Sequence, residues 1–324
     1  MRRLVRAELS RLLSRRLTWV AAIAVLLAVA GLQFAVNESV KPLSQAEIAQ
    51  GKEQYEQARL DYEQNKAEYE RGEQECIDGG NPPEQCSSEP KPEYFTYRTP
   101  VPYAEIAEIL IPTGVFLAGL ALLIVGASFI GAEFTSGALG NWLSFIPERS
   151  RVLAAKLVAL VLAAAAITAV ALGLLIGVGA LVTRAAGAQL GPMTKLWEMG
   201  GRGVVVGVIC AVIGFALALV TRHTIAAAGT VLGYLLVIYV VTALAQSVPA
   251  LQSLGPWRPE YNMLAFVEHG HTYTTYVTTV TPQGSEVNPV ERTVSFAHSA
   301  WYWLVLMTLV IAGAFAIFRR RDVH

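Results

Sequence analysis

The side chains that could carry chemistry in this sequence are few, and they stand between long apolar runs. Three groups qualify: a charged segment at 131–156, the pair Cys76 and Cys86, and the pair His269 and His271. The sequence holds no H-E-x-x-H pair, no nucleophile elbow and no G-x-x-x-x-G-K-[ST] phosphate loop. We therefore expect these groups to bind or cross-link rather than to catalyse.

The segment 131–156 predicts a short amphipathic helix. Ser136 can accept a backbone N–H bond as an N-cap, Pro147 would end the helix, and a charged turn follows at 148–151. The apolar side chains recur at helical spacing: Ala138, Leu139, Trp142, Leu143 and Ile146. We predict a helix over 136–146. A loop helix that only rests among lipid headgroups fits the same spacing equally well.

Cys76 and Cys86 lie in a long polar segment with nine residues between them. This spacing favours a disulfide that closes a turn and stabilises it by about 2–3 kcal/mol. A zinc site is a weaker interpretation, because no third or fourth ligand is close in sequence. His269 and His271 form an H-x-H pair on a strand-like loop, which is more often ordinary surface than a metal site.

The composition indicates a polytopic membrane protein. Of the 324 residues, 54% are hydrophobic and 15% are charged, and the mean hydropathy is +0.45. The formal net charge is zero, so no basic surplus points to nucleic acid. Six apolar runs reach the roughly 20 residues that cross a bilayer. They are 17–36, 110–131, 157–182, 203–221, 224–246 and 301–318. Including the residues that lead into them, the second and third spans are 105–131 and 152–182.

The distribution of Lys and Arg predicts that both termini are cytoplasmic. With the ends inside, the short cytoplasmic segments hold thirteen Lys and Arg residues and the short external loops hold five. The segment 132–151 is then cytoplasmic, and 37–104 and 247–300 are extracytoplasmic insertions. The fold class expected is all-α, with six transmembrane helices in the plasma membrane.

Residues 1–16 are predicted to form a basic amphipathic helix in the headgroup plane. Its apolar face holds Val5, Leu9, Leu12 and Leu13, and arginines such as Arg15 lie off that face. A cleaved signal peptide ending near 28–30 is the alternative. The apolar run continues to Val36, which favours a membrane span.

The first insertion, 37–104, begins with a predicted helix over about 44–72. One stripe recurs every seven residues: Ile48, Tyr55, Tyr62, Tyr69 and Cys76. The helix could be a lid over an exit or a docking surface for an outer partner. The preferred interpretation is a solvated helix whose tyrosines rest on its own protein.

The second insertion, 247–300, is predicted to contain a short helix at 249–254 and a β-hairpin. The two β-prone runs of the hairpin, 272–281 and 287–296, flank the turn residues 282–285.

Glycines recur in the predicted spans, several of them four residues apart. The pairs are Gly173 and Gly177, Gly203 and Gly207, and Gly229 and Gly233, and the second span has Gly114, Gly119 and Gly126. Small residues at this spacing let helices approach closely in lipid, so they predict a tight bundle or a seam between two copies.

The charged segment also resembles a known family. Its residues follow the gapped pattern E…G…L…P-x-x-R…K that comes after the second span of ABC exporter permeases of the type 2 class. They are Glu133, Gly137, Leu139, Leu143, Pro147, Arg149 or Arg151, and Lys156. The basic amphipathic N-terminus and the six-span layout extend the resemblance over most of the chain.

The resemblance implies a permease subunit that pairs with a second permease copy, identical or related. A separate ATPase would drive it and would bind ATP and Mg²⁺, with no cofactor in this chain. The helix at 136–146, with Trp142 on its apolar face, would be the coupling helix. Glu133 would anchor it, and Pro147, Arg149 and Arg151 would contact the ATPase.

The six apolar runs contain no Asp, Glu, Lys, Arg or His. Ion-coupled transporters need ionisable groups at membrane depth, so we expect the energy to come from another chain. The function expected is the non-enzymatic membrane subunit of an ATP-driven exporter for an amphipathic or hydrophobic drug, lipid or peptide. The alternative is a membrane-embedded sensor or scaffold whose insertions bind a ligand or partner. An intramembrane enzyme is disfavoured, because buried catalytic groups are lacking.

Overall fold

The computed structural model describes residues 1–97, 101–137, 148–245, 248–281 and 284–320. Six of its helices are long and apolar enough to cross a membrane. They are α2 (Arg16–Val40), α7 (Tyr103–Thr135), α9 (Arg149–Ala185), α10 (Met193–Thr221), α11 (Thr224–Ala245) and α14 (Phe296–Arg320). Each corresponds to one predicted span, and most extend several residues beyond it. The prediction of an all-α polytopic membrane protein is confirmed.

Helices α7, α9 and α10 form the centre of the bundle, and α7 and α10 lie closest to each other. A Cβ added at Gly126 would lie 2.0 Å from the carbonyl oxygen of Ala211, and one added at Gly214 would lie 2.0 Å from that of Leu123. No side chain fits at either position, so these glycines let the two backbones touch. Such close packing stabilises helix pairs in lipid, where the hydrophobic effect between helices is lost.

The glycine pairs spaced four apart do not all behave alike. Gly203 and Gly207 face side chains of neighbouring helices, with Thr168 Oγ1 only 2.3 Å from a Cβ added at Gly207. Gly229 and Gly233 on α11, like Gly173 and Gly177 on α9, have nothing within 4 Å of such a Cβ. The close-packing prediction is therefore confirmed for the fourth span. In the third and fifth spans these glycines make no close contact within this chain, so the expected seam between two copies stays a prediction there.

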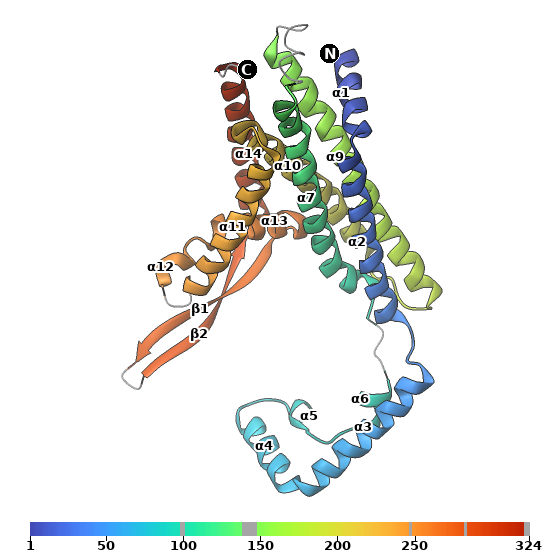
Figure 1. Ribbon diagram of the computed structural model, residues 1–324. Coiled ribbons are helices and arrows are strands. Elements are labelled where there is room, and N and C mark those ends of the chain that lie inside the picture. The colour runs from blue at the N-terminus through green and yellow to red at the C-terminus, as the bar shows by residue number, and fades with distance from the viewer. Residues whose placement is uncertain (98–100, 138–147, 246–247, 282–283, 321–324) are drawn as a thin grey trace.

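The two ends of the bundle differ in what they carry. The N-terminus, the C-terminal end of α14, the end of α7 and the start of α9 lie together at one end (Figure 1). The helix α1 (Arg2–Ser14) lies against α9 and meets α2 at Arg15. Leu12 is fully buried there, whereas Leu13 is exposed and Arg15 is half-buried. Within the single chain, the predicted apolar face packs at Leu12 and is open at Leu13, and Arg15, expected off that face, is partly buried at the junction with α2.

The first insertion projects from the opposite end of the bundle (Figure 1). It contains α3 (Gln45–Gln64), α4 (Lys66–Asp78), α5 (Pro83–Cys86) and α6 (Pro92–Thr96). The predicted single helix is two helices, interrupted at Asn65. Tyr55 lies 6.0 Å from the Phe95 ring, and Tyr62 lies 5.3 Å from Tyr69, centroid to centroid. The tyrosine stripe therefore rests on the insertion itself.

The Cys76–Cys86 disulfide is present, and it ties the end of α4 to α5.

The second insertion contains the predicted hairpin and a helix that was not predicted. After α12 (Pro249–Gln252) and the 3-10 turn η1 (Gly255–Trp257) comes α13 (Pro259–Glu268). Strands β1 (His271–Thr281) and β2 (Gly284–Val294) then pair antiparallel, with His271 opposite Val294. Proline at the first position of α13 suits a helix start, because its missing N–H is not needed there. In Figure 1, α13 lies across the bundle between α14 and α7.

Candidate functional site

The candidate site is the end of the bundle where α7 stops and α9 begins. The predicted helix at 136–146 joins these two helices, and residues 138–147 lie outside the described part of the chain. Four predicted coupling residues fall in that gap: Leu139, Trp142, Leu143 and Pro147. The remaining five, on either side of the gap, are described.

One of these five residues, Gly137, lies in the turn that ends α7. Ser136 has helical backbone angles, φ −91° and ψ −4°, and its N–H bonds to the carbonyl of Ala132. It therefore closes α7, whereas an N-cap has extended angles, so the predicted capping role is wrong. Gly137 follows with φ +67°, the left-handed conformation in which glycine commonly ends a helix.

Two further predicted residues, Glu133 near the end of α7 and Lys156 near the start of α9, meet in a buried ion cluster. The Lys156 Nζ donates to Glu133 Oε1 at 2.8 Å and to Glu8 Oε2 at 2.7 Å. The side chains of Lys156 and Glu8 are 0% exposed, and that of Glu133 is 5% exposed. Glu8 comes from α1. One ammonium group thus joins three helices.

Arg15 completes the cluster from the junction of α1 and α2. Its Nη1 donates to the carbonyl of Ser128 at 2.8 Å, and its Nη2 lies 3.4 Å from Glu133 Oε1. The Phe129 ring is shared: its centroid lies 5.0 Å from Lys156 Nζ and 5.3 Å from Arg15 Cζ. Cations close to a ring face are attracted by its negative electrostatic potential.

Two side chains of α2 bond to α1 across the backbone break at Arg15. Arg15 has φ −78° and ψ 127°, which interrupts the helix between α1 and α2. The Leu12 carbonyl accepts the backbone N–H of Arg15 at 3.3 Å, and side chains of α2 add bonds to the last carbonyls of α1. Thr18 Oγ1 donates to the carbonyl of Leu12 at 2.8 Å, and Trp19 Nε1 donates to that of Leu13 at 2.7 Å. These bonds fix the angle at which α1 reaches α9.

Glu8, Glu133, Lys156 and Arg15 are together formally neutral, with two carboxylates against one ammonium and one guanidinium. The more exposed Arg11 lies at the edge of the cluster, its Nη1 3.8 Å from Glu8 Oε1. Burial lowers the pKa of the Arg15 guanidinium, and the carboxylates of Glu133 and Glu8 oppose that shift. Arginine remains protonated in proteins, so the positive charge is kept. A buried cluster of this kind adds little net stability, but removing one partner costs about 3–5 kcal/mol, because it leaves an uncompensated charge. The geometry therefore holds α1, α7 and α9 in one arrangement.

The two predicted arginines lie apart from the cluster, on the first turn of α9. Arg151 is exposed, and its Nη1 lies 3.0 Å from Glu148 Oε2. Arg149 is half-buried. Both lie close to the segment 138–147 in sequence, and no ion pair joins either of them to the buried cluster among the contacts of the described residues given above.

Sequence reasoning missed Glu8 and Arg15. Glu8 is the only acidic residue among the first 16, and it lies one turn before Leu12 on the face that packs against α9. A lone acid on the packed face of an arginine-rich helix was the available signal. Its partner, 148 residues away, could not be read from the sequence.

The H-x-H pair has structural contacts. His271 Nδ1 lies 2.8 Å from Glu268 Oε2, and the ring of His269 stacks on Phe296 with centroids 4.6 Å apart. Within the described residues, no three His, Cys, Asp or Glu side chains gather as metal ligands.

The comparison with protein families agrees with this architecture. The model of the ABC-2 family transporter protein matches residues 3–323, nearly the whole chain. A comparison with curated proteins finds no match. Six membrane-length helices and a full-length family match lead to one conclusion: this chain belongs to the ABC-2 family, as a multi-pass membrane permease subunit that works with a partner ATPase.

Proposed function

We propose that the chain is the permease of an ATP-driven exporter and that the segment 132–151 receives the movement of a separate ATPase. The observation that carries the proposal is the Glu8–Lys156–Glu133 cluster. Glu133 lies within this segment and Lys156 just after it, and through Glu8 the cluster joins α1 to both α7 and α9. A push on the segment would therefore move α1, α7 and α9 together.

Within this proposal the segment acts as a coupling helix seated on the ATPase. Leu139, Trp142 and Leu143 supply its apolar face, and Pro147 ends it. Arg149 and Arg151 contact the ATPase in this proposal, because they follow the segment directly in sequence and Arg151 is exposed. The ATPase binds ATP and Mg²⁺, and its closure shifts the bundle between two arrangements.

The coupling end of the bundle faces the cytoplasm of a plasma membrane in this proposal. The positive-inside count supports this orientation, since the same end carries both termini. The disulfide-bonded insertion then lies on the opposite, oxidising side, where disulfides persist.

A second permease copy is expected to cover α11. Its large apolar side chains are widely exposed in the single chain: Ile225, Leu232, Leu236 and Tyr239. Gly229 and Gly233 have open space beside them. Small residues with open space let a second helix approach closely in lipid. We therefore place the homodimer seam, or the seam with a related chain, on this helix.

The cargo proposed is an amphipathic or hydrophobic drug, lipid or peptide. In the described membrane-length helices, Asp, Glu, Lys, Arg and His side chains occur only within the first or last three turns. The mid-membrane surfaces are therefore apolar, and they suit a cargo that is itself largely apolar.

Co-purification with a candidate partner ATPase tests the coupling proposal. We expect a stable complex with the unchanged chain. We expect Trp142→Glu to abolish it, because a charged side chain on the apolar face would not pack against the ATPase. Tyr94→Glu is the matched control, because Tyr94 is exposed on α6 in the other half of the molecule. Recruitment that survives Trp142→Glu would sink the role assigned to this helix.

A sensor or scaffold remains the second candidate, and the projecting insertion α3–α6 is the observation that favours it. Reconstituting the permease with its ATPase separates the two functions. Stimulation of ATP hydrolysis by a transported amphipath supports the exporter, whereas ATPase recruitment without any substrate stimulation or transport supports the sensor.

A further inference from the structure

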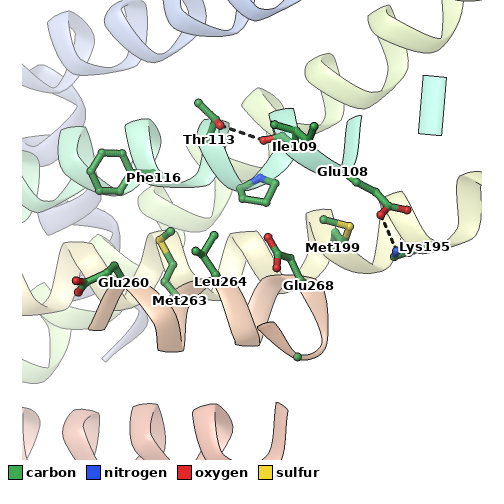
Figure 2. Close-up of a pocket in the computed structure, with 12 residues that line it drawn as sticks. Glu108, Ile109, Thr113, Phe116, Lys195, Met199, Glu260, Met263, Leu264 and Glu268 are labelled. Carbon is green, nitrogen blue, oxygen red and sulfur yellow. Dashed lines mark hydrogen bonds and ion pairs between the residues drawn. The ribbon is translucent and has the colours of Figure 1, made fainter. Parts of the chain in front are cut away.

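A cleft of about 720 Å³ lies between α7, the start of α10 and α13. Figure 2 shows side chains from all three helices pointing into the same space. Pockets of roughly 300–1,000 Å³ are typical of sites for drug-sized molecules. The cleft is at the end of the bundle away from the ion cluster, because its α7 residues fall in the first half of that helix.

The walls of the cleft are mainly apolar and adaptable. Met199 comes from α10, Met263 and Leu264 from α13, and Phe116 from α7. Methionine side chains adapt to ligands of different shape, because they are unbranched and polarisable. Phe116 is 40% exposed, so part of its ring is free to contact a ligand. The walls suit a bulky apolar body.

Charged side chains stand at the edges of the cleft, and two of the three carboxylates are paired with cations. Glu108 Oε2 lies 2.7 Å from Lys195 Nζ. Glu260 accepts from Arg258 Nε at 2.6 Å and from the Tyr234 hydroxyl at 2.6 Å. Both pairs are formally neutral.

Glu268 is the exception. Its Oε2 lies 2.8 Å from His271 Nδ1, and among the described residues no Lys or Arg forms an ion pair with it. With histidine counted as neutral, the Glu268 carboxylate keeps its formal negative charge. Glu268 is also the last residue of α13, where the helix dipole is negative. The negative charge of the carboxylate and the negative end of the helix dipole therefore reinforce each other at this point.

We propose that the cleft binds a lipophilic organic cation. The positive charge lies beside Glu268, and the apolar body packs on Met263, Met199 and the Phe116 ring. An aromatic face adds attraction for a cation. An anion of the same shape meets the Glu268 carboxylate and the negative helix end, so it is rejected. This inference rests on the proposed function only in naming the cargo class; the binding itself requires no ATPase.

Tetraphenylphosphonium and tetraphenylborate test the proposal, because the two ions have nearly the same shape and opposite charge. Equilibrium binding of each is measured to the full-length permease in nanodiscs of zwitterionic lipid, with empty nanodiscs subtracted. We expect saturable binding of the cation and none of the anion. Glu268→Gln should weaken cation binding by about tenfold, the loss of one charge-assisted contact.

Two further variants make the result specific to the cleft. Glu105→Gln removes a carboxylate from the same end of α7, outside the cleft, and should leave binding unchanged. Thr113→Trp places a large side chain in the space itself and should abolish binding. Thr113 is exposed, so this substitution is tolerated by the fold.

Equal binding of the two ions would overturn the proposal. Cation binding that is unchanged by both Glu268→Gln and Thr113→Trp would also overturn it. The absence of saturable binding would do the same, and it is the result expected if a second copy or a lipid chain fills the cleft. Failure to recruit an ATPase would refute the proposed function and leave this measurement intact, since it uses the permease alone.

Discussion

Replacing Lys156 by methionine removes the central cation of the buried cluster while nearly keeping the side-chain volume. Glu8 and Glu133 are then left without the ammonium group that lies 2.7 Å and 2.8 Å from their carboxylates. Water cannot replace it easily, because the side chain of Lys156 is 0% exposed. We expect Lys156→Met to destabilise the folded bundle by about 3–5 kcal/mol, the cost of breaking a buried ion pair.

The charge count makes the prediction more specific. Counted over Glu8, Glu133, Lys156 and Arg15, without the more exposed Arg11, the Lys156→Met variant has a net charge of −1 and Glu8→Gln alone has +1. The double variant restores neutrality, with Arg15 still beside Glu133. The double variant should therefore lose less free energy of unfolding than the two single variants added together. The difference, the coupling energy, should be about 2–3 kcal/mol.

Unfolding in mixed micelles with increasing SDS, followed by circular dichroism, measures these differences. The exposed pair Lys195–Glu108 is the matched control, because its atoms are also 2.7 Å apart but its side chains are 49% and 37% exposed. Solvent screens such a pair, so Lys195→Met should cost no more than about 1 kcal/mol. A second measurement, proteolysis of the N-terminal helix, should show faster cleavage in Lys156→Met, because α1 loses its anchor on α9.

Two results would refute the reasoning. One is a Lys156→Met cost equal to that of Lys195→Met, which would mean that the cluster is hydrated in the membrane. The other is additive single costs in the double variant, which would mean that Glu8 and Lys156 do not interact.

Other parts of the structure give predictions of their own. Gly126→Val should cost about 1–3 kcal/mol in the same SDS titration, because the added atoms meet backbone, whereas Gly173→Val, with open space around it, should be nearly neutral. Cys76→Ser with Cys86→Ser should speed proteolysis of the first insertion, a local loss of about 2–3 kcal/mol, while the SDS midpoint of the bundle stays unchanged. Tags placed at the two termini should be labelled from the same side of sealed vesicles, since both ends lie at one end of the bundle.

The proposed seam on α11 can be tested by paired substitutions. Gly229→Leu with Gly233→Leu should reduce the dimer fraction measured by cross-linking in nanodiscs, because bulky side chains prevent the close approach of two helices. The same change at Gly173 and Gly177 is the matched control, since those glycines also have nothing within 4 Å. Equal loss of dimer in both variants would argue against a seam on α11.

The sequence by itself determined the local features of this protein. The six helices follow from hydropathy, because only a long apolar run can cross a bilayer with its backbone bonds satisfied. The hairpin follows from β-prone runs around turn residues, and the disulfide from two cysteines close in sequence. Each of these signals lies within a few dozen consecutive residues.

The tertiary structure alone decided which faces of the helices meet. A span that is apolar all round gives no periodic signal for its packed side, so the sequence could not tell the packed Gly207 from the open Gly229. For the same reason it could not bring Glu8 to Lys156, or Glu268 of α13 to the cleft lined by α7 and α10. These contacts depend on the rotation and depth at which helices pack, and those are set by the fit of all neighbouring side chains together.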